Sequence, residues 1–300
     1  MKAESKMLRY SAVGGLFFAI LGIAWGWAIK SEMISFDGLY SLISLGLALF
    51  AIITTNFINK KDFKNYPFGK YNLEPIIVII KSIVLLIMCS ITMVSAIKQV
   101  LNGGNSVEEG FALSYALISS IGCTWIYLYM KRSSKNLNSE IVKAESNQWL
   151  MDSMLSVGVL IGFLISMLFK YIGFNNLSKY VDPGMVILSS SIFLRMPITS
   201  IIESFKELIY SSANDEINYD INNLVKEIEE EYKLEDSIAR VAKVGRELRI
   251  EIDFIVSNDS KIKSVDDMDK VREFIDKNTN HFDLKKWLNI SFTKNKKWAI

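Results

Sequence analysis

The chain has 300 residues and a net charge of +2, and 50% of its residues are apolar. Residues 1–210 contain 18 Lys/Arg and 13 Asp/Glu, whereas the last 90 residues contain 16 and 19. The first segment is therefore too apolar for a soluble enzyme, a disordered protein or a secreted disulfide scaffold. The small net charge gives no reason to expect a nucleic-acid partner. We predict a polytopic α-helical membrane domain at 1–210 and a soluble domain at 211–300.

Six apolar segments are long enough to cross a lipid bilayer, which requires about 20 residues per helix. They lie at 8–29, 33–58, 73–101, 110–130, 147–172 and 183–205. An even number of crossings places both termini on the same side of the membrane.

Positively charged residues at and beyond the ends of these segments gather on one side of the membrane. Eleven lie on the side of the termini, namely Lys2, Lys6, Arg9, Lys60, Lys61, Lys64, Lys70, Lys131, Arg132, Lys135 and Lys143. Four lie on the other side, namely Lys30, Lys98, Lys170 and Lys179. The positive-inside rule therefore predicts that both termini are cytoplasmic. We expect a multi-pass protein of the plasma membrane.

The first half of the charged tail has a helix pattern followed by two strand patterns. Apolar residues recur at helical spacing over 217–228, and residues 248–256 alternate between apolar and charged as in a half-buried strand. A partner strand is predicted at 237–244, with the turn at Gly245 and Arg246.

A second helix and a third strand complete the tail. Ser264 and Asp267 have the spacing of a capping box that begins a helix. Alternation returns over 288–292. The order helix, strand, strand, helix, strand predicts a small α+β domain in which two helices pack on one sheet.

Four acidic residues lie within or at the start of the apolar segments, where ionisable groups are costly and usually functional, namely Asp37, Glu74, Asp152 and Asp182. Asp37 lies one turn into the second segment, and Ser41 follows it by four residues. In the fifth segment Gln148 precedes Asp152 by four residues. Residues at i and i+4 share a helix face, so the two faces together would form an all-oxygen cation site.

Each neutral member of this set has a simpler interpretation. Ser41 alone is more typical of helix packing, and Gln148 alone could equally form an interhelical hydrogen bond. Asn147 is an alternative to Gln148 as the inward-facing residue. Asp182 precedes Pro183 and is predicted to be the N-cap of the sixth apolar helix.

The six segments, the motif PFGKYNLEP at the start of the third, VDPG at the start of the sixth and the αββαβ tail resemble the cation diffusion facilitator family. The resemblance implies a homodimeric transporter that exchanges a divalent metal for protons, usually exporting the metal from the cytoplasm. It also implies a ferredoxin-like tail that dimerises. The family's transport site would fall on Asp37, Ser41, Gln148 and Asp152.

The sequence departs from the family pattern at four positions. Ser41 replaces the usual aspartate of the second helix, and Gln148 replaces the histidine or aspartate of the fifth. Many members also pair a basic residue, two positions before the glutamate of the third helix, with an acid after the sixth. Those positions are Asn72 and Tyr210 in this chain. Contacts other than an ion pair must therefore hold the junction between the sixth helix and the tail.

The expected ligands determine which ion the site would favour. Zinc prefers nitrogen and sulfur ligands, whereas hard oxygen ligands suit manganese, magnesium, calcium or ferrous iron. We therefore expect a secondary transporter for Mn/Fe/Mg-type ions rather than zinc, with the metal as substrate and no prosthetic group. Since the only histidine, His281, lies in the tail, Asp37 and Asp152 would carry the protons.

Two other classes of function are weaker interpretations. A non-transporting membrane sensor or scaffold could share the fold, but it would have no reason to retain two costly carboxylates. An enzyme is not expected, because no nucleophile–base pair, phosphate-binding loop or intramembrane zinc motif occurs in the sequence.

Overall fold

The computed structural model describes residues 2–60, 62, 64–137, 140–282 and 284–299. The chain forms two compact units, here called the helical unit (Met1–Ile53 and Lys81–Thr199) and the mixed unit (Thr54–Ile80 and Ser200–Ile300). Three long helices continue from one unit into the other, so this division differs from the domain limit expected at residue 210. That limit stays a prediction.

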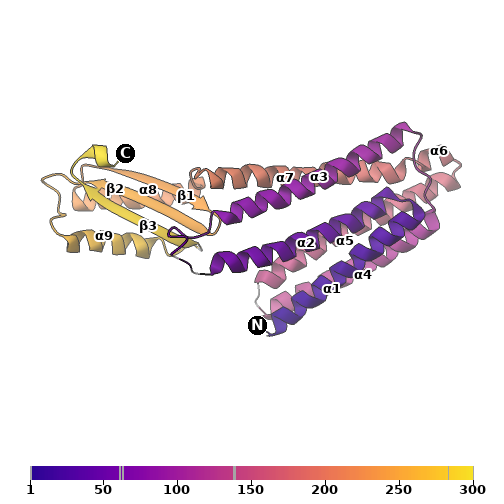
Figure 1. Ribbon diagram of the computed structural model, residues 1–300, viewed down its shortest axis with the longest axis horizontal. Coiled ribbons are helices and arrows are strands. Elements are labelled where there is room, and N and C mark those ends of the chain that lie inside the picture. The colour runs from indigo at the N-terminus through magenta and orange to yellow at the C-terminus, as the bar shows by residue number, and fades with distance from the viewer. Residues whose placement is uncertain (1, 61, 63, 138–139, 283, 300) are drawn as a thin grey trace. The chain divides into compact units, whose positions relative to one another are not determined.

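The helical unit is built from long helices joined by short connections (Figure 1). The helices that form it or enter it are α1 (Lys2–Ile29), α2 (Glu32–Asn59), α3 (Leu73–Leu101), α4 (Glu109–Leu137), α5 (Glu140–Tyr171), α6 (Asn175–Ser178) and α7 (Val181–Leu208). The six long helices coincide with the six predicted apolar segments. The short helix α6 was not predicted, because four residues carry too little periodicity.

Five helical segments of the described chain are long and apolar enough to cross a membrane. They are Arg9–Ile29, Leu73–Leu101, Glu109–Ser133, Gln148–Tyr171 and Asn175–Leu208. Helix α2 contains several positions whose side chains lie outside the described part, so the sixth span stays a prediction. The chain is therefore a multi-pass membrane protein by the length and composition of its helices.

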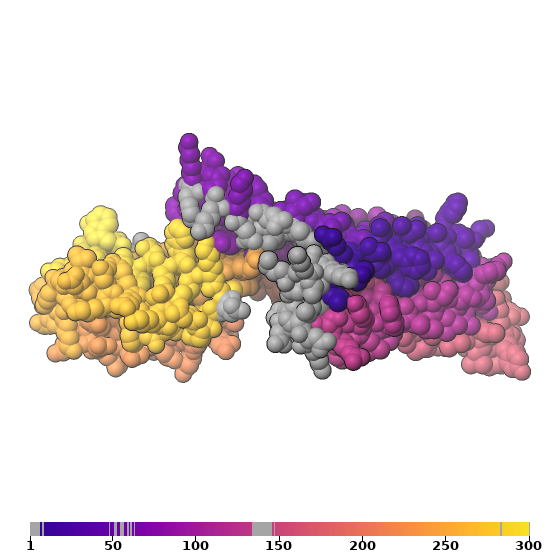
Figure 2. All heavy atoms as spheres, turned by 90° about the horizontal axis from the view of Figure 1, so that it is seen from below, coloured from indigo at the N-terminus to yellow at the C-terminus, as the bar shows by residue number. Residues whose placement is uncertain are grey.

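Helices α4 and α5 pack along each other, and α1 packs against both. In Figures 1 and 2 the indigo α1 lies beside these magenta and pink helices. Glycines let α1 and α2 approach closely, since a Cβ added to Gly22 would lie 2.8 Å from the Cα of Gly38. Small residues permit such backbone contacts between membrane helices. The contact fixes the backbone next to Asp37.

The mixed unit confirms the predicted order of helices and strands. Its elements are α8 (Asp215–Tyr232), β1 (Asp236–Val244), β2 (Glu247–Ile255), α9 (Val265–Asn278), β3 (Lys285–Thr293) and the 3₁₀ helix η1 (Lys296–Trp298). The strand order is β1-β2-β3, with β1 antiparallel and β3 parallel to β2. Parallel strands need a crossover connection, and α9 provides it.

Strand alternation places the apolar core on one face of this sheet. Four alternating residues of β2 are fully buried, namely Leu248, Ile250, Ile252 and Phe254. They form one cluster with buried residues of α8 and α9, among them Ile221 and Ile275. The tight β1–β2 turn uses Gly245 at φ +57°. The predicted capping box is confirmed, because Ser264 and Asp267 exchange hydrogen bonds at the start of α9.

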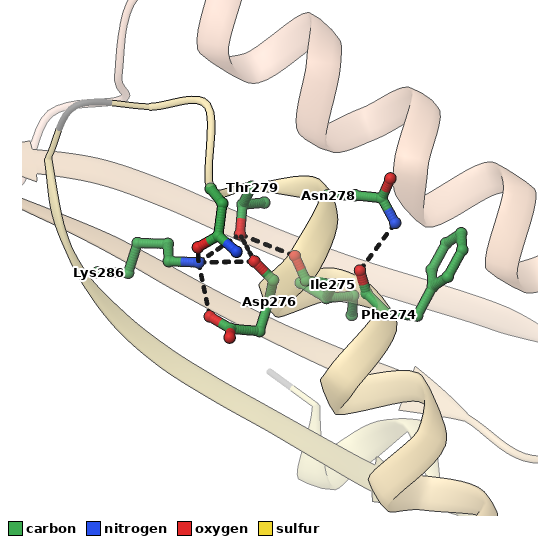
Figure 3. Close-up of polar contacts among 7 residues, drawn as sticks. Phe274, Ile275, Asp276, Asn278, Thr279 and Lys286 are labelled. Carbon is green, nitrogen blue, oxygen red and sulfur yellow. Dashed lines mark hydrogen bonds and ion pairs between the residues drawn. The ribbon is translucent and has the colours of Figure 1, made fainter.

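The C-terminal end of α9 is held by a lysine from β3 (Figure 3). The Lys286 Nζ donates to the Asp276 carbonyl at 2.7 Å, to its carboxylate at 2.6 Å and to the Asn280 Oδ1 at 2.8 Å. A cation next to the last carbonyls of a helix is favourable, because those groups have no intrahelical partner and carry partial negative charge. Lys286 therefore joins the crossover helix to the strand that follows it.

Candidate cation site

A cavity of about 60 Å³ lies among α1, α2, α4 and α5 in the helical unit. All four residues predicted from the sequence line it, namely Asp37, Ser41, Gln148 and Asp152. A buried water needs roughly 15 Å³, so the cavity has room for a few water molecules or a partly hydrated ion. The structure thus brings the four residues together, and their role as ligands stays a prediction.

Asp37 is the buried carboxylate of the cavity, with 7% of its surface exposed. Its Oδ2 accepts a hydrogen bond of 2.7 Å from the hydroxyl of Tyr115 on α4. The phenol ring is also buried, at 1% exposure. The orientation of the Asp37 carboxylate is therefore determined by a neighbouring helix as well as by α2.

The α5 residues are less enclosed. Asp152 is half-buried and Gln148 is exposed, although both line the cavity. The Gln148 side-chain amide donates to the Ser44 hydroxyl on α2 at 3.0 Å. This bond is the interhelical contact that the simpler interpretation of Gln148 predicts, and it leaves the amide oxygen as the group that could reach an ion. The side chain of the alternative residue, Asn147, lies outside the described part.

Sequence reasoning missed the contribution of α4. Ser119 and Cys123 line the cavity, and Tyr115 lies one turn before Ser119 on the same helix face. The Ser119 hydroxyl also lies 2.8 Å from that of Ser156 on α5. Their i, i+4, i+8 spacing was a usable signal, but single hydroxyl or thiol groups in apolar helices usually serve packing or bond to their own backbone.

The donor set of the cavity is poor in charge. Among the described residues, no three His, Cys, Asp or Glu side chains come together as a metal site. A cation here would therefore rely on two carboxylates, with hydroxyl, amide and water oxygens completing its coordination. Two carboxylates balance the charge of a divalent ion, and oxygen donors suit hard ions.

The structure gives Asp182 a different role from the one predicted from the sequence. The N-cap prediction for Asp182 is wrong, because α7 begins one residue earlier, at Val181. The Asp182 carboxylate instead accepts hydrogen bonds from the Ser31 hydroxyl at 2.5 Å and the Glu32 amide at 2.9 Å. It therefore caps the start of α2, whose unpaired amides favour a negative charge.

The ion pair that many family members form at the positions of Asn72 and Tyr210 is replaced in this chain by a hydrogen-bonded pair of uncharged side chains within the mixed unit. The Asn72 side-chain amide donates to the Tyr210 hydroxyl at 2.9 Å. The same hydroxyl accepts a second bond from the Arg249 guanidinium at 2.8 Å. Hydrogen bonds thus replace the ion pair at these two positions.

Helices of membrane-spanning length that enclose a cavity with two carboxylates define a multi-pass membrane protein with a candidate ion-binding site. The chain belongs to the cation efflux family, since the model for the cation efflux transmembrane domain matches residues 8–209. Members of this family are transporters rather than enzymes.

Three relatives illustrate the range of this similarity. The magnetosome protein MamB of Magnetospira sp. (strain QH-2) is 23% identical over 87% of this chain and 85% of its own length. The manganese efflux system protein MneP of Bacillus subtilis (strain 168) is 25% identical over 68% of this chain and 66% of its own length. The manganese efflux system protein MneS of the same organism is 22% identical, over 54% of this chain and 56% of its own length.

Proposed function

We propose that the chain exports a divalent metal cation across the plasma membrane. Asp37 and Asp152 would be the charged ligands, and Ser41 and Gln148 would supply neutral oxygens. The observation that carries this proposal is the shared cavity, which is lined by all four residues. Two relatives are named as manganese efflux system proteins, which supports a metal cation as the substrate.

The preferred ion would be manganese, ferrous iron or magnesium rather than zinc. The four proposed ligands supply only oxygen, whereas tetrahedral zinc sites are usually built from nitrogen and sulfur. Cys123 is the one sulfur among the described residues of the cavity wall. Its thiol lies within 4 Å of the Ser119 and Ser156 hydroxyls. A single thiol without histidine partners does not make a typical zinc site.

Protons would move in the opposite direction to the metal. The described cavity wall contains no histidine, so Asp37 and Asp152 would bind protons when the metal leaves and release them when the next ion enters. In this cycle the cavity alternates between a metal-loaded and a protonated state. The expected driving force is the proton gradient across the membrane.

The architecture proposed for this activity extends the described fold. Helix α2 would form the sixth span, which places both termini in the cytoplasm. The tail, with its αββαβ order, would be a ferredoxin-like domain that joins two copies in a homodimer. The proposed transport domain covers 1–210, and the proposed regulatory and dimerisation domain covers 211–300.

The test is metal uptake by liposomes that contain the purified full-length protein. Manganese, ferrous iron, magnesium, calcium and zinc would be compared, with the pH of the lumen recorded at the same time. Asp37→Asn and Asp152→Asn would be measured beside the wild type. Asp259→Asn is the control, because it removes an exposed carboxylate in the tail.

We expect manganese to enter while the lumen becomes more alkaline, and we expect both cavity substitutions to abolish this exchange. Uptake without a change in lumen pH would reject proton antiport but retain metal export. No uptake of any ion above empty liposomes would favour the alternative, a non-transporting membrane sensor or scaffold with the same fold.

A further inference from the structure

The contact between Tyr115 and Asp37 suggests how the cavity selects among hard cations. The Tyr115 hydroxyl is 2.7 Å from the Asp37 Oδ2, and both side chains are buried. A phenol in this position can donate only one hydrogen bond. In this structure the carboxylate receives it.

The local packing holds the hydroxyl in this position. A Cβ added to Gly22 on α1 would lie 2.8 Å from the Tyr115 hydroxyl oxygen and 2.8 Å from the Cα of Gly38. The absence of a side chain at residue 22 therefore allows the hydroxyl to reach the carboxylate beside Gly38. Three helices define the position of a single carboxylate oxygen.

We infer that Tyr115 is a positioning residue whose hydrogen bond occupies one acceptor site of the Asp37 Oδ2 and disfavours binding of the transported ion through both carboxylate oxygens, so that Asp37 binds through Oδ1 and the site discriminates against calcium. The inference rests on the proposed function, whose ligands it uses. It deepens that function by separating calcium from the smaller divalent ions, which oxygen chemistry alone does not do.

The physical reason lies in how these ions use carboxylates. Calcium takes six to eight oxygen ligands and commonly binds carboxylates through both oxygens. Magnesium requires fewer ligands at shorter distances and retains several waters. With one acceptor site of the Asp37 Oδ2 already engaged, the carboxylates of the cavity offer fewer oxygen ligands for that larger shell. Groups that hold a ligating side chain typically change metal affinity or activity by about 10- to 100-fold when they are replaced.

The decisive variant is Tyr115→Phe, which removes the hydroxyl and keeps the ring. Its ratio of manganese to calcium uptake in liposomes should fall about tenfold relative to the wild type, mainly because calcium uptake rises. Tyr127→Phe is the matched control, since Tyr127 lies on the same helix but its hydroxyl accepts a hydrogen bond from Lys131. In an Asp37→Asn background, Tyr115→Phe should leave the binding ratio of the two ions unchanged, because the group it positions is gone.

A second measurement uses the wild-type protein and does not depend on how the variant folds. Infrared difference spectra of the manganese-loaded and metal-free protein report whether a carboxylate binds through one oxygen or two. The Asp37 band is assigned by its loss in Asp37→Asn. We expect the wide splitting of the two carboxylate stretches that is typical of one-oxygen binding.

The outcomes separate this inference from the proposed function. Manganese uptake by the wild type with an unchanged ion ratio in Tyr115→Phe would overturn the inference and leave metal export in place. A uniform loss of both fluxes at constant ratio would mean that Tyr115 only supports packing, and would also overturn it. The narrow splitting of two-oxygen binding in the wild type would do the same. An absence of uptake by the wild type would reject metal export itself.

Discussion

The carboxylate of Glu74 binds both the backbone and the side chain of Arg246 within the mixed unit. Its Oε2 accepts the Arg246 amide at 2.9 Å, and its Oε1 accepts the guanidinium at 2.7 and 2.5 Å. Glu207, near the end of α7, accepts the adjacent Gly245 amide at 2.9 Å. The tight turn between β1 and β2 is therefore held by acidic residues of two long helices.

This arrangement predicts that Glu74→Ala loosens the β1–β2 turn. The hydrogen bonds that Arg246 donates to Glu74 raise the pKa of the Arg246 guanidinium, so this group stays charged at any pH at which the protein is handled. Because the pair is partly exposed, we expect a modest effect of about 1 kcal/mol. Amide hydrogen exchange over residues 244–248 should accelerate roughly fivefold. The exposed residue Glu203 provides the control, Glu203→Ala, and equal exchange in both variants would contradict the prediction.

Asp182→Ala should destabilise the helical unit without changing ion preference. The substitution removes a buried acceptor of bonds from Ser31, Glu32 and Met33, at an expected cost of about 2–4 kcal/mol. Thermal unfolding in detergent measures the loss, and Glu108→Ala removes an exposed acid as a control. A changed manganese-to-zinc preference in the surviving protein would instead assign Asp182 to the transport site.

The start of α9 should respond to acid. Hydrogen bonds from the backbone amide of Lys263 and from Ser264 lower the pKa of Asp267 from 3.8 to about 2. A lowered folded-state pKa means that its stabilising contribution is complete above the ordinary value and is lost as the pH falls towards 2. Hydrogen exchange of α9 at decreasing pH should reveal this loss.

In Asp267→Asn the acid-dependent loss over this pH range should disappear, whereas Asp266→Asn should retain it. Ser264→Ala removes the other half of the capping box and should cost about 1 kcal/mol at neutral pH. The same acid response in Asp267→Asn as in the wild type would assign it to another group.

Lys286→Met should weaken the C-terminal end of α9 (Figure 3). Methionine retains the apolar part of the side chain and removes the ammonium that bonds to Asp276 and Asn280. We expect a loss of about 1–2 kcal/mol, because the ammonium is mostly buried against a helix end. Lys261→Met, at an exposed position in the loop between β2 and α9, tests whether any lysine-to-methionine change has this effect. Similar melting of the two variants would contradict the prediction.

Much of the fold could be predicted because it depends on local periodicity. The long apolar run over 73–101 is almost sufficient to predict one helix, and the alternation of apolar and charged residues along 247–255 is almost sufficient to predict one strand. The start of α9 could be predicted as well, since a capping box is complete within four residues. Asp182 could not be interpreted in the same way. Its local context fits an N-cap, whereas its hydrogen-bond donors at the start of α2 lie about 150 positions earlier in the chain.

The long helices, the strands and the two i, i+4 pairs that carry Asp37 and Asp152 could be predicted from the amino-acid sequence, because these properties follow from neighbouring residues. That both pairs line one cavity, that Tyr115 engages one oxygen of Asp37 and that Gln148 binds Ser44 became evident from the folded chain alone. These relationships depend on which helix faces meet. Helix–helix contact in a membrane is governed by close packing of small residues such as Gly22 and Gly38, which leaves only a weak periodic signal in the sequence.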